Sequence, residues 1–421
     1  MAPRSLRADA DTILRAAIAA ADPAAAVERA LGEHALLDQA RAVHVFAIGK
    51  AAAAMTAAAL RHVHAASADV VVPHGTPTHH LEPFPFVRIV HAGHPLPDLS
   101  SLAAGNAIDE RLAGIPAGDL VLFLISGGAS ALAVLPEDDI TFVEYAHCID
   151  LLMRAGADIR ELNTVRHHID SLKGGGMARR TAHTRATGLI LSDVVGDALD
   201  VIASGPLTPP TDSPADAIRI LRSRGVWDQC APSIRASLTR APTRDDVPTT
   251  HVRTSIVAGN RTAVDGAAAA ARRLGYHVHV VDQPVTGEAR TAGERLGHFA
   301  LDARTAADGP TCFIAGGETT VTVRGNGRGG RNQELALAAA LVIASDDHIA
   351  IGSIGTDGVD GPTDAAGAIG DAGTIRTLGA GSARAALDDN DSYRALDTAD
   401  ALIRTGPTGT NVADVQVVLL R

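Results

Sequence analysis

The stretch DLVLFLISGGASAL (residues 119–132) decides the fold class of this chain. Its first part, 119–126, is the clearest buried strand of the sequence, because it is almost wholly apolar and is bounded by Gly118 and Gly127. An alanine-rich segment follows the glycines, so the strand is expected to lead through a tight turn into a helix. A strand, a glycine turn and a helix together form the repeating unit of α/β proteins.

The same pattern recurs on both sides of this stretch. Further strands are predicted at 43–49, 68–73, 86–91, 187–193, 253–260, 276–282, 348–354 and 414–420. Helices are predicted at 8–32, 50–63, 97–112, 138–154, 158–168 and 331–344. Residues 311–323 are expected to form two strands that join at Gly316 and Gly317, with a hairpin as one option. The alternation predicts an α/β fold with a largely parallel sheet and helices on both of its faces.

The length of the chain predicts two domains. Its 421 residues exceed what one domain usually holds. The segment 239–251, rich in Pro, Thr and Asp, is interpreted as the approach to a linker, and 253–260 as the start of a fresh strand–turn–helix unit. We therefore expect an N-terminal domain at 1–240 and a smaller C-terminal α/β domain with a mixed sheet at 241–421.

Composition excludes several classes of protein. The net charge is −11 and no run of Lys and Arg stands out, which argues against a nucleic-acid partner. Cys148, Cys230 and Cys312 lie far apart without a CxxC pair, which argues against a disulfide framework or a zinc cluster. No apolar run reaches about 18 residues, and the N-terminus is typical of a helix and not of a signal peptide. A cytoplasmic protein without membrane contact is predicted.

Two strand ends in the first half carry candidate anion-binding groups. Gly49 and Lys50 stand where a strand passes into a helix, and an anion there would meet free N–H groups and the ammonium together. The alternative is a surface lysine that points away. The glycines of Ser126-Gly127-Gly128 would let the backbone approach a phosphate or carboxylate, and the alternative is a tight turn that needs glycine.

Two further segments of the first half are less specific. Asn163 and Arg166 precede the glycine turn that begins at Lys173, and a helix end with a glycine cap explains this pattern equally well. Asp193 follows a buried strand, where a carboxylate could bind a metal or act as a general base. A capping or turn aspartate is the alternative interpretation of Asp193.

The densest candidate lies at 316–334. Residues 325–330 spell GxGxxG before a helix, but a nicotinamide site needs an acidic residue at the end of the next strand. Asp346 and Asp347 precede that strand instead. A glycine-rich loop with Arg328 and Arg331 at the start of a helix favours a phosphate-bearing ligand.

The acidic loop GTDGVDGPTD (355–364) could ligate a hard cation through Asp357, although a series of Asp-Gly turns is the alternative. A group of histidines lies earlier in the chain, and a structural or solvated role is favoured over a zinc site for all of them. They are His74, His79, His80, His91 and His94.

Taken together, these segments resemble the class II glycerate 2-kinase family, whose N-terminal domain is of the DUF4147 type and whose C-terminal part is the MOFRL domain. The resemblance rests most strongly on GGRNQEL (329–335) and GTDGVDGPTDAAG (355–367), with support from AIGKAAAAM (47–55) and NTVRHHIDSLKGG (163–175). One departure is Gly176-Met177, where an arginine or another long residue is expected after KGG.

The resemblance implies ATP-dependent transfer of a phosphoryl group to the 2-hydroxyl of D-glycerate with Mg²⁺, giving 2-phosphoglycerate and ADP. It also implies a Rossmann-like N-terminal domain and an active site in a cleft between the domains. Lys50 and Arg331 match positions of key active-site cations in the family. A homodimer is compatible with this interpretation.

The catalytic residues expected are Lys50, Asp193 and Arg331, with Asp193 and Asp357 as metal ligands. The expected substrate- and nucleotide-binding residues are Gly49, Ser126, Gly127, Gly128, Ser130, Asn163, Arg166, Lys173, Asn260, Glu318, Arg328, Asn332 and Glu334. The alternative activity is an NAD(P)H-dependent hydroxypyruvate reductase. A non-catalytic protein that binds glycerate or a nucleotide is the third class considered.

Overall fold

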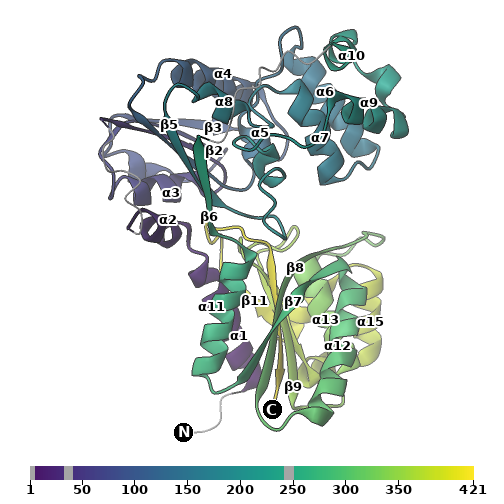
Figure 1. Cartoon of the computed structure of the whole chain (residues 1–421). Helices are drawn as coiled ribbons and strands as arrows, with labels where there is room; N and C mark the ends of the chain where they lie inside the picture. The colour runs from purple at the N-terminus through teal and green to yellow at the C-terminus, as the bar shows by residue number, and fades with distance from the viewer. Residues whose placement is uncertain (1–4, 33–40, 241–250) are drawn as a thin grey trace. The chain divides into compact units, whose positions relative to one another are not determined.

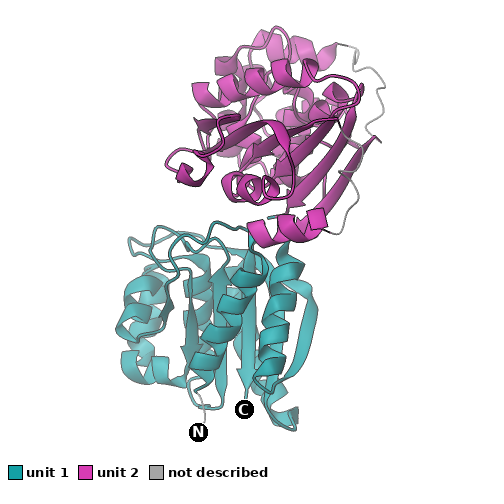
Figure 2. Cartoon of the chain, turned by 90° about the vertical axis from the view of Figure 1, so that its left-hand side faces the viewer, with its two compact units in different colours: residues 1–22, 193–195, 258–421 teal, residues 23–192, 196–257 magenta. Residues whose placement is uncertain are grey.

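A computed structural model of the chain describes residues 5–32, 41–240 and 251–421. The chain divides into two compact units (Figure 2). Unit 1 contains residues 1–22, 193–195 and 258–421, and unit 2 contains 23–192 and 196–257. Each unit is described by itself. Residues 241–250 are not described. The predicted domain boundary at 240/241 and the predicted linker therefore stay predictions.

Unit 2 is built on a six-stranded sheet with the order β3-β2-β1-β4-β5-β6. Its strands are β1 (Val43–Ile48), β2 (Ala65–Pro73), β3 (Val87–Ala92), β4 (Leu120–Ile125), β5 (Arg185–Leu191) and β6 (Val252–Ala258). The neighbours from β3 to β5 all pair in parallel, which confirms the predicted Rossmann-like sheet. Ile48 pairs with Ile125, so β1 and β4 end side by side. The segments that follow these two strands therefore begin at one edge of the sheet.

Helices cover both faces of this sheet, with α2 and α3 on one side and α4 and α8 on the other (Figure 1). A second cluster packs α6, α7, α9 and α10 around a separate hydrophobic core. The helices of unit 2 are α2 (Pro23–Gly32), α3 (Ala52–Ala59), α4 (Leu99–Ala113), α5 (Ala129–Leu132), α6 (Phe142–Arg154), α7 (Ile159–Ile169), α8 (Gly176–Arg180), α9 (Pro214–Ser223) and α10 (Pro232–Thr239). Short 3-10 helices are η2 (His79–Leu81), η3 (Ile202–Ser204) and η4 (Trp227–Gln229).

Unit 1 also has a six-stranded sheet, with the order β11-β10-β9-β12-β8-β7. Its strands are β7 (His277–Glu288), β8 (Thr311–Thr320), β9 (Ile349–Gly355), β10 (Gly367–Asp371), β11 (Leu402–Ile403) and β12 (Asp414–Leu420). β7 and β8 pair in parallel and the other neighbours pair antiparallel, which confirms the predicted mixed sheet. β10 and β11 were not predicted, because they are short and carry no long apolar run.

Helices α1 and α11 cover one face of the second sheet, and α12 and α13 cover the other, with α15 packed against α13 (Figure 1). The helices of unit 1 are α1 (Leu6–Ala20), α11 (Asn260–Arg273), α12 (Ala289–Ala306), α13 (Arg331–Val342), α14 (Ala372–Leu378), α15 (Ala380–Asp388) and α16 (Ser392–Thr398). Among the residues that the structure describes, we find no helix with the length and apolar character needed to cross a membrane.

The predicted hairpin at 311–323 is wrong. β8 is one continuous strand that contains both Gly316 and Gly317. The two glycines make room for neighbours instead of turning the chain. A Cβ on Gly316 would lie 1.5 Å from Oδ1 of Asn260, and one on Gly317 would lie 2.1 Å from the carbonyl oxygen of Val285.

Two other predicted elements differ from the structure. The helix predicted at 8–32 is divided into α1 and α2 just before Pro23, and the two parts belong to different units. The strand predicted at 253–260 was expected to open a fresh unit, but β6 lies beside β5 at the edge of the first sheet. Strand neighbours of this kind depend on long-range pairing, which local sequence patterns do not encode.

Candidate active site

In unit 2, the segments after β1 and β4 bond to each other. The Lys50 N–H donates to the Gly127 carbonyl over 2.9 Å, and the Ala51 N–H donates to Oγ of the buried Ser126 over 3.1 Å. A Cβ on Gly49 would lie only 2.1 Å from that Oγ. The close fit explains the glycine and holds Lys50 at the carboxyl edge of the parallel sheet, where ligands of α/β proteins bind.

His94 lies beside Lys50, although the sequence interpretation gave this histidine a structural or solvated role. Gly128 has φ of +90°, and a Cβ there would lie 2.9 Å from His94 Cδ2 and 3.6 Å from Lys50 Cγ. Burial, followed by the charge of Lys50, lowers the pKa of the His94 imidazole. His94 closely follows the carboxyl end of β3, and that position was a signal that could have identified it.

A second polar network in unit 2 joins three predicted residues. Ser130 Oγ lies 2.9 Å from Ser204 Oγ, which donates to Asn163 Oδ1 over 2.8 Å. Arg166 Nη1 donates to the same Oδ1 over 3.3 Å. Ser204 has φ of +60°, a conformation that costs about 1–3 kcal/mol in a non-glycine residue and is often found at functional sites. Sequence reasoning did not single out the Ser204 side chain.

Lys173 is placed differently from the other predicted cations. Its side chain is buried and Nζ donates to the Ala133 carbonyl over 2.6 Å. Burial lowers the pKa of Lys173, while Asp170 raises it. Its ammonium group therefore already has protein partners.

In unit 1, Arg331 at the start of α13 is held by two carboxylates. Its Nε and Nη2 donate to the two carboxylate oxygens of Asp414 over 2.6 and 2.8 Å, and Nη1 lies 3.3 Å from Glu318 Oε1. Asp414 is fully buried, whereas the side chains of Arg331 and Glu318 are 35% and 49% exposed. Although burial acts in the opposite direction, the Asp414 bonds hold the pKa of Arg331 above its ordinary value.

Further carboxylates act on Glu318. Burial raises the pKa of Glu318, Arg331 opposes this rise, and the charges of Asp414, Asp193 and Asp357 add to it. Asp193 follows β5 in sequence, yet residues 193–195 belong to unit 1. The predicted metal ligands therefore act on the same carboxylate, although no three acidic, histidine or cysteine side chains of the described residues are arranged to hold a metal ion by themselves.

The N-terminus of α13 does not offer the free N–H groups that the sequence interpretation placed there. The Asn332 N–H donates to Oδ1 of Asp360 over 3.1 Å, and the Gln333 N–H donates to Oδ2 over 2.9 Å. Burial raises the pKa of Asp360 to about 6. The Asn332 side chain is also buried and bonds to Asp360 and Ser353, so Asn332 supports the helix start from within.

The glycine-rich loop at 325–330 is likewise occupied by protein groups. Asn390 Oδ1 accepts from the Gly325 N–H over 3.0 Å, and the carboxylates of Asp389 and Asp391 accept from the two residues at 326 and 328. A Cβ on Gly325 would lie 2.3 Å from the Asp389 carbonyl oxygen. The GxGxxG pattern therefore reflects close packing against residues 389–391, and the N–H groups of residues 325–328 are not available to a pyrophosphate in this conformation.

The remaining predicted residues of unit 1 do not contact the Arg331 guanidinium. Arg328 Nε donates to the Pro362 carbonyl, and its guanidinium lies 4.9 Å from the centre of the Tyr393 ring. Glu334 accepts from Asn390 over 3.1 Å. Asn260 donates to the carbonyl oxygens of Val412 and Asp414 and so supports the backbone beside the buried carboxylate.

The structure therefore groups the predicted residues into three sets and leaves others outside them. The first set lies at one edge of the first sheet and contains Gly49, Lys50, Ser126, Gly127 and Gly128. The second set is the hydrogen-bonded network of Ser130, Asn163 and Arg166. In unit 1, Glu318 is acted on by the charges of Arg331, Asp193 and Asp357. Outside these sets lie Lys173, Asn260, Arg328, Asn332 and Glu334. The predicted homodimer stays a prediction.

Comparison with known proteins gives consistent matches. Residues 9–239 match a domain of unknown function, DUF4147, and residues 311–414 match the MOFRL family. A D-glycerate 2-kinase of Thermotoga maritima is 37% identical over 426 residues, covering 99% of each chain. The crystal structure of a glycerate kinase from Thermotoga maritima has a TM-score of 0.91 and 37% identity over the whole of both chains. An Agrobacterium vitis protein, provisionally named a hydroxypyruvate reductase, is 37% identical over 97% of this chain and 93% of its own.

Proposed function

The chain belongs to the glycerate 2-kinase family, and on that premise we propose that it transfers the γ-phosphoryl group of ATP to the 2-hydroxyl of D-glycerate. The products are 2-phosphoglycerate and ADP. The observation that carries the proposal is the Arg331 cluster. It combines a fixed, partly exposed cation with carboxylates suited to a divalent metal, and both are needed where phosphoryl groups are transferred.

Charge neutralisation is the main task of such a site. In the reaction, the 2-hydroxyl oxygen bonds to the γ-phosphorus while the bond from that phosphorus to the β–γ bridging oxygen breaks. Negative charge on the transferring group must be stabilised, and fixed cations do this without reorganising. Arg331 and Lys50 are proposed for this role, or for holding the glycerate carboxylate. Asp193 is proposed to take the hydroxyl proton or to bind the metal.

The carboxylates of unit 1 fit a magnesium ion. Burial raises the pKa of Glu318, and the charges of Asp193 and Asp357 raise it further, while Arg331 lowers it. Mg²⁺ commonly binds one or two carboxylates together with substrate phosphates. Asp193 and Asp357 are proposed as its ligands, and the ion would neutralise phosphate charge when bound.

The groups of unit 2 are proposed to bind glycerate and the nucleotide. Lys50 stands at the edge of the parallel sheet next to the glycines after β4, whose small size lets a ligand approach the backbone. His94 beside it is expected to be neutral at pH 7, because burial and Lys50 both lower its pKa. Asn163 and Arg166 are proposed to add polar contacts.

The reductase alternative is not favoured. It relied on the GxGxxG pattern at 325–330, and the Gly325 N–H is already bonded to Asn390. In addition, Asp346 and Asp347, which lie at about the expected distance from the glycines, precede β9 instead of following it. The name of the Agrobacterium vitis relative favours the reductase. The assay below separates the two activities.

The test combines product identification with matched variants. Glycerate and ATP should give 2-phosphoglycerate in phosphorus NMR, with release of ADP and no oxidation of NADH or NADPH by hydroxypyruvate. Lys50→Met and Asp193→Asn should each lower kcat strongly. Formation of 3-phosphoglycerate, or reduction of hydroxypyruvate, would refute the proposed function. Near-normal turnover of Asp193→Asn would remove only the role given to Asp193.

A further inference from the structure

Two of the three cysteines of the chain are in contact, although 82 positions separate them in sequence. Cys148 lies in the middle of α6, and Cys230 lies between η4 and α10. Their sulfur atoms are 3.7 Å apart. Both are free thiols in the hydrophobic core of the α6, α7, α9 and α10 cluster, where they are 0% and 3% exposed. Packing therefore holds two thiols side by side without a covalent bond between them.

The hydrogen bonds around the pair make the two sulfurs unequal. The Cys230 thiol donates to the Val226 carbonyl oxygen over 3.3 Å, so Cys148 is the thiol that donates to Cys230 Sγ. The bond from Cys148 lowers the pKa of Cys230, burial opposes this, and the charge of Arg235 supports it. The same bond, together with burial, raises the pKa of Cys148. Since the thiolate is the reactive form of a cysteine, Cys230 is the nucleophile of the pair.

Cys230 is also the thiol that lies nearer to the surface. It directly follows the short helix η4, in which the side chain of Asp228 is 94% exposed. Arg235, in the first half of α10, is 35% exposed. Short connecting segments at the surface open locally more often than the centres of long helices. A small oxidant therefore reaches Cys230 through this segment, whereas Cys148 is reached through Cys230.

We propose that Cys148 and Cys230 form an oxidation site, at which a hydroperoxide converts the two thiols into a reversible disulfide. The Cys230 thiolate attacks one oxygen of hydrogen peroxide, which breaks the O–O bond and leaves a sulfenic acid on Cys230. The released hydroxide takes up the proton that Cys230 had lost and becomes water.

Cys148 completes the reaction. Its sulfur attacks the Cys230 sulfur, and the sulfenic hydroxyl leaves with the Cys148 proton as a second molecule of water. Two thiols are thus oxidised to one disulfide while one peroxide is reduced to two molecules of water. A thiol reductant reverses the change by thiol–disulfide exchange. The proposal does not depend on the kinase assignment.

The disulfide would join α6 to the start of α10 across the core of the helical cluster. The two sulfurs need only close from contact to a bond of about 2 Å, and Cys230 lies outside the regular helices, where the backbone adjusts most easily. The bond closes a loop of 82 residues. A loop of this length restricts the unfolded chain, so the oxidised protein should resist unfolding better than the reduced protein.

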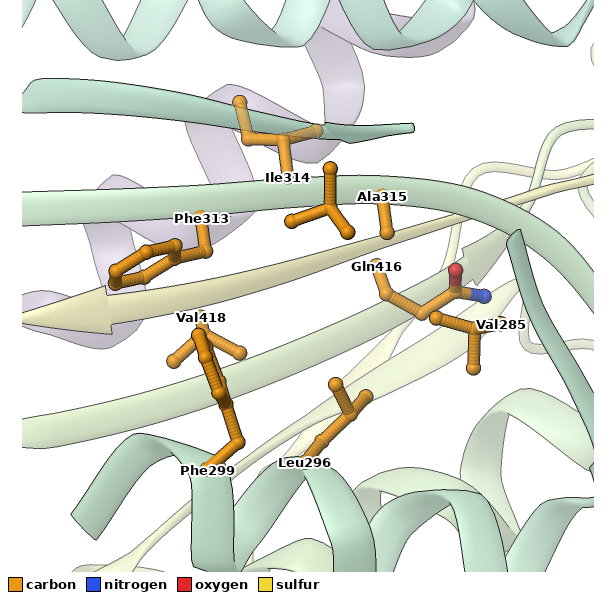
Figure 3. Close-up of a pocket in the computed structure, with 9 residues that line it drawn as sticks. Val285, Leu296, Phe299, Phe313, Ile314, Ala315, Gln416 and Val418 are labelled. Atoms are coloured by element: carbon orange, nitrogen blue, oxygen red, sulfur yellow. The ribbon is translucent and has the colours of Figure 1, made fainter. Parts of the chain in front are cut away.

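Cys312 supplies an internal control. It is buried in β8, next to Phe313, which lines an apolar pocket of unit 1 (Figure 3). Successive side chains of a strand point to opposite faces, so Cys312 points away from that pocket. Its sulfur makes a weak contact of 4.0 Å with the Phe313 carbonyl oxygen, and burial raises its pKa to about 12. With the other two cysteines paired to each other, Cys312 should stay a thiol under the same treatment.

The test treats the whole chain with hydrogen peroxide at pH 7, unfolds it in urea and alkylates the remaining thiols with iodoacetamide. Mass spectrometry should find Cys312 alkylated and a peptide from α6 linked to a peptide that contains Cys230. Dithiothreitol should make all three cysteines available again. Before alkylation, the oxidised chain should unfold at a higher urea concentration than the reduced chain.

Two matched variants locate the effect. Cys312→Ala should form the disulfide as the wild type does. Cys148→Ala removes the resolving thiol, so dimedone should trap a sulfenic acid on Cys230, and peroxide should no longer raise the urea midpoint.

The proposal is overturned if all three cysteines of the peroxide-treated wild type are alkylated, or if Cys312 is oxidised as fast as Cys230. Disulfides between chains in a non-reducing gel, without the internal link, would show that the thiols react between copies instead. An unchanged urea midpoint after complete oxidation would refute the stabilising effect. Should Cys148→Ala fail to fold, the peptide map of the wild type still shows whether the link forms.

Discussion

Replacing Gly128 by Ala tests the contact that sets Lys50 and His94 side by side. Gly128 has φ of +90°, and the added Cβ would lie 2.9 Å from His94 Cδ2 and 3.0 Å from Nε2. Lys50 Cγ is 3.6 Å away, which is an ordinary van der Waals distance. The substitution should therefore displace the imidazole and leave the lysine stem where it is.

Two contributions to the free energy of unfolding can be separated. A left-handed backbone costs about 1–2 kcal/mol in an alanine. Crowding the histidine ring should add about 1–3 kcal/mol, the usual cost of overpacking. Gly118 supplies the matched control, because its φ is +96° and an added Cβ would have no atom within 4 Å. Gly118→Ala should show the backbone cost alone.

The assay is urea unfolding followed by tryptophan fluorescence. Trp227 is the single tryptophan of the chain and lies in unit 2 with both glycines, so its signal reports on the unit that is changed. Gly128→Ala should unfold at lower urea than Gly118→Ala, and its kcat for glycerate phosphorylation should fall while that of Gly118→Ala stays close to wild type.

A double variant tests whether His94 causes the extra destabilisation. Adding His94→Ala to Gly128→Ala removes the atoms that the new Cβ meets, so the extra destabilisation should disappear and leave the backbone cost. The reasoning is refuted if Gly128→Ala and Gly118→Ala are equally stable, or if removing His94 leaves the extra loss in place.

Three further predictions concern unit 1. Arg331→Met should lower kcat by roughly 10²–10³-fold, the usual effect of losing one fixed electrostatic group, while Arg328→Met should stay close to wild type; similar kinetics for the two would contradict the assignment. Asp360 binds its proton more tightly folded than unfolded, since its pKa rises from 3.8 to about 6. The protonated carboxyl should therefore stabilise the folded state fully below pH 3.8, and about 3 kcal/mol of this stabilisation should be lost as the pH rises through 6. Urea unfolding across this range should show that the free energy of unfolding depends less on pH in Asp360→Asn than in the wild type. Asn390→Ala removes the acceptor for two N–H groups of the glycine-rich loop, so it should cost about 1–3 kcal/mol and speed amide hydrogen exchange at 324 and 325; unchanged exchange would count against this role.

Much of the fold could be predicted from local pattern. The apolar runs at β1, β4 and β9 are buried on both faces of their sheets, and such strands are visible in sequence as continuous hydrophobic segments. Glycines and polar residues after these runs located the edge of the first sheet at Gly49 and Ser126. β6 was predicted as a strand, but its place beside β5 was not predicted, because β5 lies some sixty residues earlier in the chain.

The candidate site was predicted only in part. Lys50 and Arg331 stand out by charge, since cations at helix starts are unusual in an acidic protein. His94 was not singled out, although it follows the end of β3, and the room that Gly128 leaves for its ring appears only in the folded chain. Asp360 was predicted as part of an acidic loop, but its role as the partner of the N–H groups of α13 depends on a contact across 28 residues.

By itself, the sequence determined the α/β class, the strand ends that carry polar groups and the resemblance to a kinase family, because hydrophobic periodicity and short motifs are local properties. Only the tertiary structure decided which groups are already bonded to protein and which face a ligand. The GxGxxG loop shows the difference: the N–H groups of residues 325, 326 and 328 donate to residues 389–391, more than sixty positions away. Hydrogen bonds between distant segments form only when the chain is folded, so a motif alone cannot show whether its donors are free.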